Sequence, residues 1–145
     1  MSKRNYPSSP IVAASVAIWR DDQILLASRS KPPNAQRWAM PGGVVELGET
    51  LEAAAIREVK EETALELDEV QFLRFHEVIE RDENDRTKLH YVLAIFAAKS
   101  AHGDAMAGDD AAAVCWYRVE DLPNLPMTGR SEEFILQSKE LLEIG

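Results

Sequence analysis

The chain has 145 residues, of which 46% are hydrophobic and 28% are charged, and its formal net charge is −9. This composition is typical of a globular protein, and we expect one domain over residues 1–145. The acidic balance argues against nonspecific binding to nucleic acid or to an anionic membrane. A phosphate-rich ligand would need metal ions or local basic residues to offset the same repulsion.

The cysteine count and the apolar runs bear on the compartment. Cys115 is the only cysteine, so no internal disulfide can form, which fits a reducing compartment. Its apolar neighbours favour a buried, inert thiol over a reactive one. No apolar run approaches the roughly 20 residues of a membrane helix. Residues 11–19 imitate a signal-peptide core, but charged Arg20 and Asp21 follow where small residues should lie. We therefore expect a cytoplasmic protein.

Apolar runs bounded by turn residues predict a set of strands. The predicted strands cover residues 11–19, 24–30, 43–46, 65–81, 90–98 and 114–118. Helical spacing predicts one helix from the N-cap Thr50 to about Thr63 and a second over residues 131–144. Strands with two interspersed helices predict an α/β sandwich with a mixed sheet between helical layers. The polar residues 1–9 are expected to form a loose terminus.

Three carboxylates crowd the last full turn of the first helix, at Glu58, Glu61 and Glu62. Positions i, i+3 and i+4 share a helix face, and like charges at that spacing cost roughly 0.2–0.5 kcal/mol per pair. A hard divalent cation such as Mg²⁺ would offset this cost, because it prefers carboxylate oxygens. For these three residues taken alone, a solvated acidic face is the alternative. Gly42 and Gly43 would let the backbone approach a ligand closely, and the Gly43 carbonyl is a further candidate ligand.

The spacing of these residues resembles the signature of the Nudix hydrolase family. Five residues separate Gly43 from Glu49, and seven more lead to the run Arg57-Glu58-Val59-Lys60-Glu61-Glu62-Thr63-Ala64-Leu65. Every specified position matches except the second glycine of the signature, which is Ala64 here. The resemblance covers residues 10–145 in order and implies a Nudix-type α/β/α sandwich. Ala64 predicts either a left-handed residue at a cost of roughly 1 kcal/mol or a helix end reshaped by one residue.

The resemblance also implies roles for the residues of the motif. It implies that Glu58, Glu61 and Glu62 bind Mg²⁺, with Mn²⁺ as a substitute, and that water attacks phosphorus and cleaves a P–O–P bond. An ion pair between Glu49 and Arg57 would support the geometry of the loop and the helix.

Relatives often recruit another acidic group from outside the motif, as a ligand or general base. Asp109 and Asp110 are the first candidates, because they precede the last predicted strand; turn formation is the alternative. Arg29, at the end of the second strand, is a candidate phosphate contact or a solvated arginine. The competing acidic residues are Glu80, Asp82, Glu83 and Asp85.

The remaining chemistry-bearing residues favour no other mechanism. His76, His90 and His102 have no metal-ligand spacing and are expected to be ordinary strand or loop residues. The three tryptophans could stack on a base, but core packing is expected for each. The chain lacks a Ser/His/Asp arrangement and a Walker-type glycine loop, which argues against a covalent intermediate.

The motif and the loops together favour a pyrophosphohydrolase. We expect Mg²⁺-dependent hydrolysis of a nucleoside diphosphate linked to another moiety, and the resemblance points to ADP-ribose or a similar nucleotide sugar. The first alternative is a house-cleaning nucleoside triphosphate pyrophosphatase. The second is a non-catalytic nucleotide-binding module, which the retained carboxylates disfavour. The expected partner is a small nucleotide, with no nucleic acid and no membrane, and a homodimer stays open.

Overall fold

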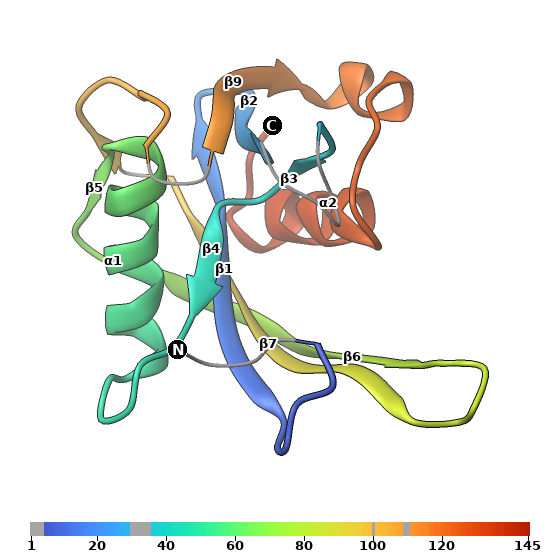
Figure 1. Cartoon of the computed structure of the whole chain (residues 1–145). Helices are drawn as coiled ribbons and strands as arrows, with labels where there is room; N and C mark the ends of the chain where they lie inside the picture. Colours follow the sequence, from blue (N-terminus) through green and yellow to red (C-terminus); the bar gives the residue numbers. More distant parts are fainter. Residues whose placement is uncertain (1–4, 30–35, 100, 109–110) are drawn as a thin grey trace.

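The computed structural model describes residues 5–29, 36–99, 101–108 and 111–145, and Figure 1 shows their arrangement. The elements in chain order are β1 (Ile11–Arg20), β2 (Gln23–Arg29), β3 (Trp38–Ala39), β4 (Gly42–Val44), α1 (Leu51–Thr63), β5 (Glu66–Leu67), β6 (Gln71–Arg81), β7 (Thr87–Ala98), β8 (Ala101–His102), β9 (Ala111–Arg118), a short 3₁₀-helix (Val119–Asn124) and α2 (Ser131–Leu141). None of these helices is long and apolar enough to cross a membrane.

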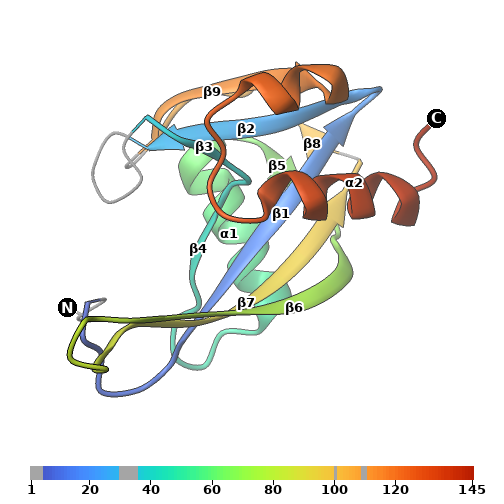
Figure 2. The ribbon, with the colours of Figure 1, turned by 90° about the vertical axis from the view of Figure 1, so that its right-hand side faces the viewer.

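Strand β1 is the centre of the sheet. It runs parallel to β7 from Ile11 to Ile18 and antiparallel to β4, while β6 extends the sheet beyond β7. It meets β2 only beside their shared turn, where Trp19 pairs with Ile24. From that turn β2 diverges to pair with β9 and β3, as Figure 2 shows. The predicted hairpin is therefore present but short, and its two strands belong to separate parts of a mixed sheet.

The two helices cover opposite faces of the central strands (Figures 1 and 2). On β1, Val16 and Ile18 point into the cluster under α1, whereas Ala17 and Trp19 belong to the cluster that includes α2 residues. Successive strand residues point to opposite faces, so a strand buried on both faces is apolar throughout. This confirms the predicted α/β/α sandwich with a mixed sheet between helices.

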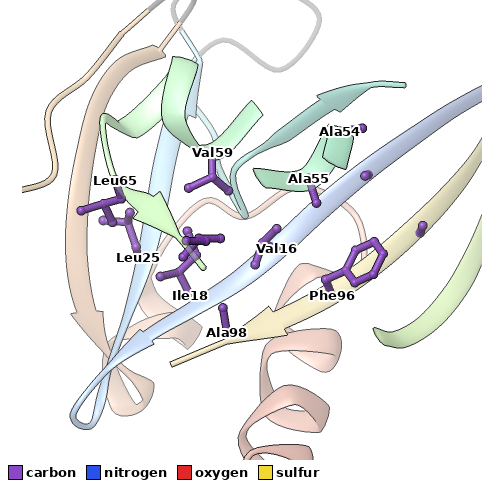
Figure 3. Packing of buried hydrophobic residues seen from close by; sticks show 12 residues of the cluster. Val16, Ile18, Leu25, Ala54, Ala55, Val59, Leu65, Phe96 and Ala98 are labelled. Atoms are coloured by element: carbon purple, nitrogen blue, oxygen red, sulfur yellow. The ribbon is translucent and has the colours of Figure 1, made fainter. Parts of the chain in front are cut away.

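Helix α1 begins at the predicted N-cap and packs through small residues. The Thr50 side chain accepts a hydrogen bond from the Ala53 N–H at 3.1 Å, which satisfies one of the helix's free amide donors. Ala54, Ala55 and Val59 are fully buried against the sheet, as Figure 3 shows. Because alanine side chains are short, the helix axis can lie close to β1.

Two predicted segments differ from the structure. Residues 65–81 do not form one strand: β5 pairs with β8, and the chain bends before β6 pairs with β7. Between the predicted strands at 90–98 and 114–118, the structure accordingly contains β8 and the start of β9. Leu67 is buried in the cluster under α1, so the chain must turn there before it can re-enter the sheet.

One residue of the N-terminal segment is fixed to the sheet, and the single cysteine is less buried than expected. Tyr6 is held on the β6–β7 hairpin, because its N–H donates to the Lys88 carbonyl at 2.8 Å and its hydroxyl to Asp82 at 2.9 Å. Cys115 lies on β9 and is half-buried, so the prediction of a buried thiol is only partly right.

The tryptophans pack in the core, as expected. Trp19 is fully buried, and its indole N–H donates to the Ser138 hydroxyl at 2.8 Å. Trp38 contacts the ring of Tyr117 edge-on, and Trp116 packs against the cluster under α1.

Ala64 ends α1 in the left-handed conformation. Its φ is 67° and its ψ is −1°, and its N–H donates to the Lys60 carbonyl at 2.9 Å. Of the two outcomes expected for this position, the structure therefore has the strained left-handed residue. Glycine adopts this conformation without steric cost, whereas alanine does not.

We expect Ala64→Gly to leave the free energy of unfolding unchanged or to raise it by up to about 1 kcal/mol, measured by urea titration. Relief of the left-handed strain opposes the greater freedom of glycine in the unfolded chain. Ala53→Gly is the matched control, because Ala53 is exposed and right-handed within α1 and the change should cost about 1 kcal/mol. A large loss of stability in Ala64→Gly would contradict this account of the helix end.

Candidate functional site

Arg57 connects α1 to the loop that precedes it. Its Nε and Nη2 donate to the two carboxylate oxygens of Glu49 at 2.7 and 2.9 Å, and Nη2 also donates to the Val44 carbonyl at 3.1 Å. The paired side chains are mostly shielded, with 25% of Arg57 and 16% of Glu49 exposed. Such a two-pronged contact fixes both distance and orientation. It holds the end of β4 against the middle of α1.

The same guanidinium reaches two carboxylates of the last turn. Arg57 Nη1 donates to Glu58 Oε1 at 2.9 Å and to Glu61 Oε2 at 3.1 Å. One positive charge thus lies between two negative side chains that would otherwise repel each other. The spacing of four residues from Arg57 to Glu61 makes this contact geometrically natural on a helix.

The two glycines bring the β4 backbone against these carboxylates. A Cβ on Gly43 would lie 2.6 Å from Glu58 Oε1, and one on Gly42 would lie 2.6 Å from the Ser15 Cα. A side chain at Gly42 would therefore push β4 away from β1, whereas one at Gly43 would displace the Glu58 carboxylate. The Gly42 N–H donates to Glu62 Oε2 at 3.2 Å. The β4 backbone therefore lies against α1, and the Gly42 N–H contributes a polar group to the carboxylate cluster.

The structure thus brings most of the motif into one place. The residues gathered there are Gly42, Gly43, Glu49, Arg57, Glu58, Glu61 and Glu62.

The expected residues outside the motif fall into three groups. Asp109 and Asp110 lie outside the described residues, but the Gly108 N–H beside them donates to the Glu62 carbonyl at 2.9 Å. Arg29 ends β2 and pairs with Ala111, whose N–H donates to the Gly108 carbonyl at 3.0 Å. The competing acidic residues Glu80, Asp82, Glu83 and Asp85 lie towards the tip of the β6–β7 hairpin, which projects away from α1 in Figure 1.

Two contributors escaped the sequence analysis. Gly108 and Met106 donate backbone hydrogen bonds to the carbonyls of Glu62 and Thr63. The signal for Gly108 was only a glycine in a loop rich in small residues, and backbone donors leave no signature in the residue type.

The ion pair shifts the titration of both partners. The hydrogen bonds from Arg57, aided by the Glu46 N–H, lower the pKa of Glu49 from 4.5 to about 2. The same bond to Glu49, followed by the one to Glu58, raises the pKa of Arg57 further. Both groups are therefore charged at neutral pH.

The residues fit a hard cation by their chemistry, but they do not surround a common point. In residues 5–29, 36–99, 101–108 and 111–145, no group of three or more His, Cys, Asp or Glu side chains is positioned to hold a metal. Glu58 and Glu61 face Arg57, and Glu62 faces the Gly42 N–H. Mg²⁺ is commonly bound through one or two carboxylates, with waters and substrate phosphates completing its shell. Carboxylates on one helix turn beside a glycine backbone match that requirement.

The histidines take no part in this cluster. His76 lies against the ring of Phe134, where burial, with the charges of Arg130 and Arg74, lowers its pKa. His102 contacts Asp68 at 2.7 Å. That the three histidines are ordinary strand or loop residues stays a prediction.

Known proteins are similar to this chain in sequence and in fold. The NUDIX domain family matches residues 9–137. An ADP-ribose pyrophosphatase of Methanocaldococcus jannaschii is 36% identical over 116 residues, which are 80% of this chain and 66% of that protein. The NAD-capped RNA hydrolase NudC of Edwardsiella ictaluri is 34% identical over 88% of this chain and 46% of its own length. A MutT NUDIX hydrolase from Burkholderia pseudomallei has a similar structure, with a TM-score of 0.79, 30% identity, and coverage of 90% of this chain and 98% of that one.

We expect Arg57→Ala to lower the free energy of unfolding by about 2 kcal/mol, because it leaves the shielded Glu49 carboxylate and the Val44 carbonyl without their donor. Urea unfolding followed by circular dichroism measures this loss. Lys60→Ala is the control on the same helix: its pair with Glu66 is 64% and 61% exposed, so the unfolding midpoint should hardly move. Equal losses in the two variants would contradict the bracing role of Arg57.

The lowered pKa of Glu49 predicts a specific acid sensitivity. A carboxylate with a depressed pKa stabilises the fold above its unfolded value and loses that contribution as pH falls. The stability advantage of the wild type over Glu49→Gln should thus be full above pH 4.5 and vanish towards pH of about 2. Urea titrations of both proteins over that range measure it, and an advantage independent of pH would refute the assignment.

Proposed function

The chain belongs to the Nudix hydrolase family, and we propose that it hydrolyses the diphosphate of a small nucleotide derivative with the help of a divalent cation. The proposed substrate class is a nucleoside diphosphate linked to another moiety, with ADP-ribose as the first candidate. We propose Mg²⁺ as the cation, with Mn²⁺ as a substitute.

One observation carries this proposal: the arrangement of α1 against β4. Glu58 lies against the Gly43 backbone, Glu62 accepts the Gly42 N–H, and Arg57 holds Glu58 and Glu61 on the same side of the helix. A solvated acidic face would need none of these contacts. The arrangement keeps carboxylate oxygens next to a backbone segment where a ligand can approach without meeting a side chain.

The proposed cation ligands are Glu58, Glu61 and Glu62, together with the Gly43 carbonyl. A bound divalent cation would neutralise diphosphate charge and polarise a phosphoryl oxygen. The protein's own part is to hold the carboxylates in place, through Arg57 and through the Gly42 N–H. Since the net charge is −9, a diphosphate would be repelled from this surface unless a cation accompanied it.

The proposed reaction adds water to one phosphorus and breaks its bond to the bridging oxygen. From ADP-ribose it yields AMP and ribose 5-phosphate, and the two products share the oxygen and hydrogens of the water. We propose Asp109 and Asp110 as candidates for the base that takes the proton of the water, and Arg29 as a phosphate contact. Arg29 has support from the backbone pairing that links it, through Ala111 and Gly108, to the end of α1.

The choice of ADP-ribose is supported by the similarity to the ADP-ribose pyrophosphatase of Methanocaldococcus jannaschii. This chain spans 66% of that protein. A nucleoside triphosphate pyrophosphatase and a non-catalytic nucleotide-binding module remain the competing proposals. A panel of ADP-ribose, NAD⁺, nucleotide sugars and nucleoside triphosphates separates them by the products released. The cytoplasmic location and a homodimer stay predictions.

We expect the purified protein to release AMP and ribose 5-phosphate from ADP-ribose with Mg²⁺, and Glu61→Gln and Glu62→Gln each to lower kcat on the order of 100-fold. Each change keeps the side-chain volume but removes the charge that would hold the cation. Liquid chromatography of the products measures the rates.

The matched control is Glu52→Gln, the same substitution at an exposed position in the first turn of α1. Its rate should equal that of the wild type. Release of pyrophosphate from nucleoside triphosphates, without cleavage of ADP-ribose, would show that the protein is a nucleoside triphosphate pyrophosphatase instead. Nucleotide binding without turnover on any panel member would favour the binding module.

A further inference from the structure

The last turn of α1 carries its carboxylates at the helix C-terminus, where negative charge is electrostatically unfavourable. Carbonyl groups without intrahelical partners give a helix C-terminus a partial negative charge, which disfavours anionic side chains there. Glu58, Glu61 and Glu62 therefore face both mutual repulsion and the helix dipole. Something outside the helix has to hold this turn in place.

A segment distant in sequence closes the carbonyl end of α1. The Met106 N–H donates to the Thr63 carbonyl at 2.7 Å, and the Gly108 N–H donates to the Glu62 carbonyl at 2.9 Å. Two of the orphan carbonyls thus receive donors from residues 101–108, which we call the closing segment. One of them belongs to Glu62, a proposed cation ligand.

Gly108 is the point of closest approach. A Cβ on this residue would lie less than 3.0 Å from the Glu61 carbonyl oxygen, a backbone atom that cannot swing aside. No other residue type fits unless the closing segment or the helix end shifts. Glu61 and Glu62 thus have their backbone positions set by a residue outside the motif.

The closing segment is itself tethered at its start. Arg20 Nη2 donates to the carbonyls of Ala101 and Gly103 at 3.0 and 3.1 Å, and its guanidinium lies over the ring of Trp116. Strand β8 pairs with β5, which follows α1 directly. The segment is therefore fixed to β1 at one end and to α1 at the other.

We propose that the closing segment is a positioning element for the proposed cation ligands, and that Gly108 and Arg20 are its positioning residues. This inference rests on the proposed function, because it concerns the cation affinity of the same carboxylates. When the closing segment no longer contacts α1, the last turn of the helix frays and the carboxylates move apart. Cation binding then weakens although every ligand is still present.

The experiment measures Mn²⁺ binding to the free protein by electron paramagnetic resonance, without substrate. Gly108→Ala should weaken Mn²⁺ binding about tenfold or more relative to the wild type. Gly129→Ala is the control: Gly129 has a φ of 47° and no atom near its absent Cβ, so this change adds strain without touching α1. Its Mn²⁺ affinity should equal that of the wild type.

A second variant and a second measurement distinguish loss of positioning from a general loss of structure. Arg20→Met keeps the length of the side chain but removes its donors to the closing segment, and it should weaken Mn²⁺ binding in the same direction as Gly108→Ala. Saturating Mg²⁺ should restore kcat in Gly108→Ala but not in Glu62→Gln, because only the latter lacks a ligand.

The outcomes separate this inference from the proposed function. Unchanged Mn²⁺ affinity in folded Gly108→Ala and Arg20→Met, with an active wild type, would overturn the positioning role alone. A wild type that binds no Mn²⁺ without substrate would overturn the positioning role, and absence of turnover on the substrate panel as well would overturn both. A wild type that binds Mn²⁺ but cleaves no panel substrate would leave the positioning role testable by affinity and would overturn only the hydrolysis.

Discussion

The guanidinium of Arg57 is the interaction on which the arrangement of the site depends. It binds both oxygens of Glu49, the Val44 carbonyl, and one oxygen each of Glu58 and Glu61. It therefore ties the end of β4 to two successive turns of α1. This contact lowers the pKa of Glu49 to about 2, so the carboxylate keeps its charge well into the acid range. A lysine would offer a single point of attachment, whereas the planar fork of arginine spans several acceptors at once.

Three sets of contacts hold the carboxylate cluster, and each offsets a different unfavourable interaction. Arg57 reduces the repulsion between Glu58 and Glu61, and the Gly42 N–H partners one oxygen of Glu62. The backbone donors of Met106 and Gly108 satisfy carbonyls that the helix leaves unpaired. These supports come from β4, from α1 itself and from the segment before β9. Only the full fold brings them together, so the acidic turn depends on tertiary structure more than on the helix propensity of its own sequence.

Local sequence logic predicted the parts of the fold whose causes are local. Thr50 caps α1 as predicted, and Ala64 adopts one of the two conformations expected for it, because these positions depend on residues at most four apart. The ion pair between Glu49 and Arg57 was expected from the family resemblance, and the structure contains it. The pairing of β5 with β8 joins residues about 35 positions apart, and two-residue strands have no detectable period. The approach of Gly108 to Glu61 could not be predicted either, because a contact between backbone atoms leaves no pattern in the side chains.

The net charge of −9 determines which ligands the carboxylate cluster can attract. An acidic protein gains nothing from concentrating carboxylates beside a glycine backbone if the purpose is stability, since such charges repel one another. The same concentration makes the site attractive to a cation, and a cation-bound diphosphate carries less negative charge than the free anion. Under the proposed function, recognition and charge compensation would be one event: a cation that relieved the repulsion between the carboxylates would also relieve the repulsion between protein and substrate. A site of this kind discriminates against anions that cannot share a metal with it, which is a form of selectivity that arises from the charge of the whole chain.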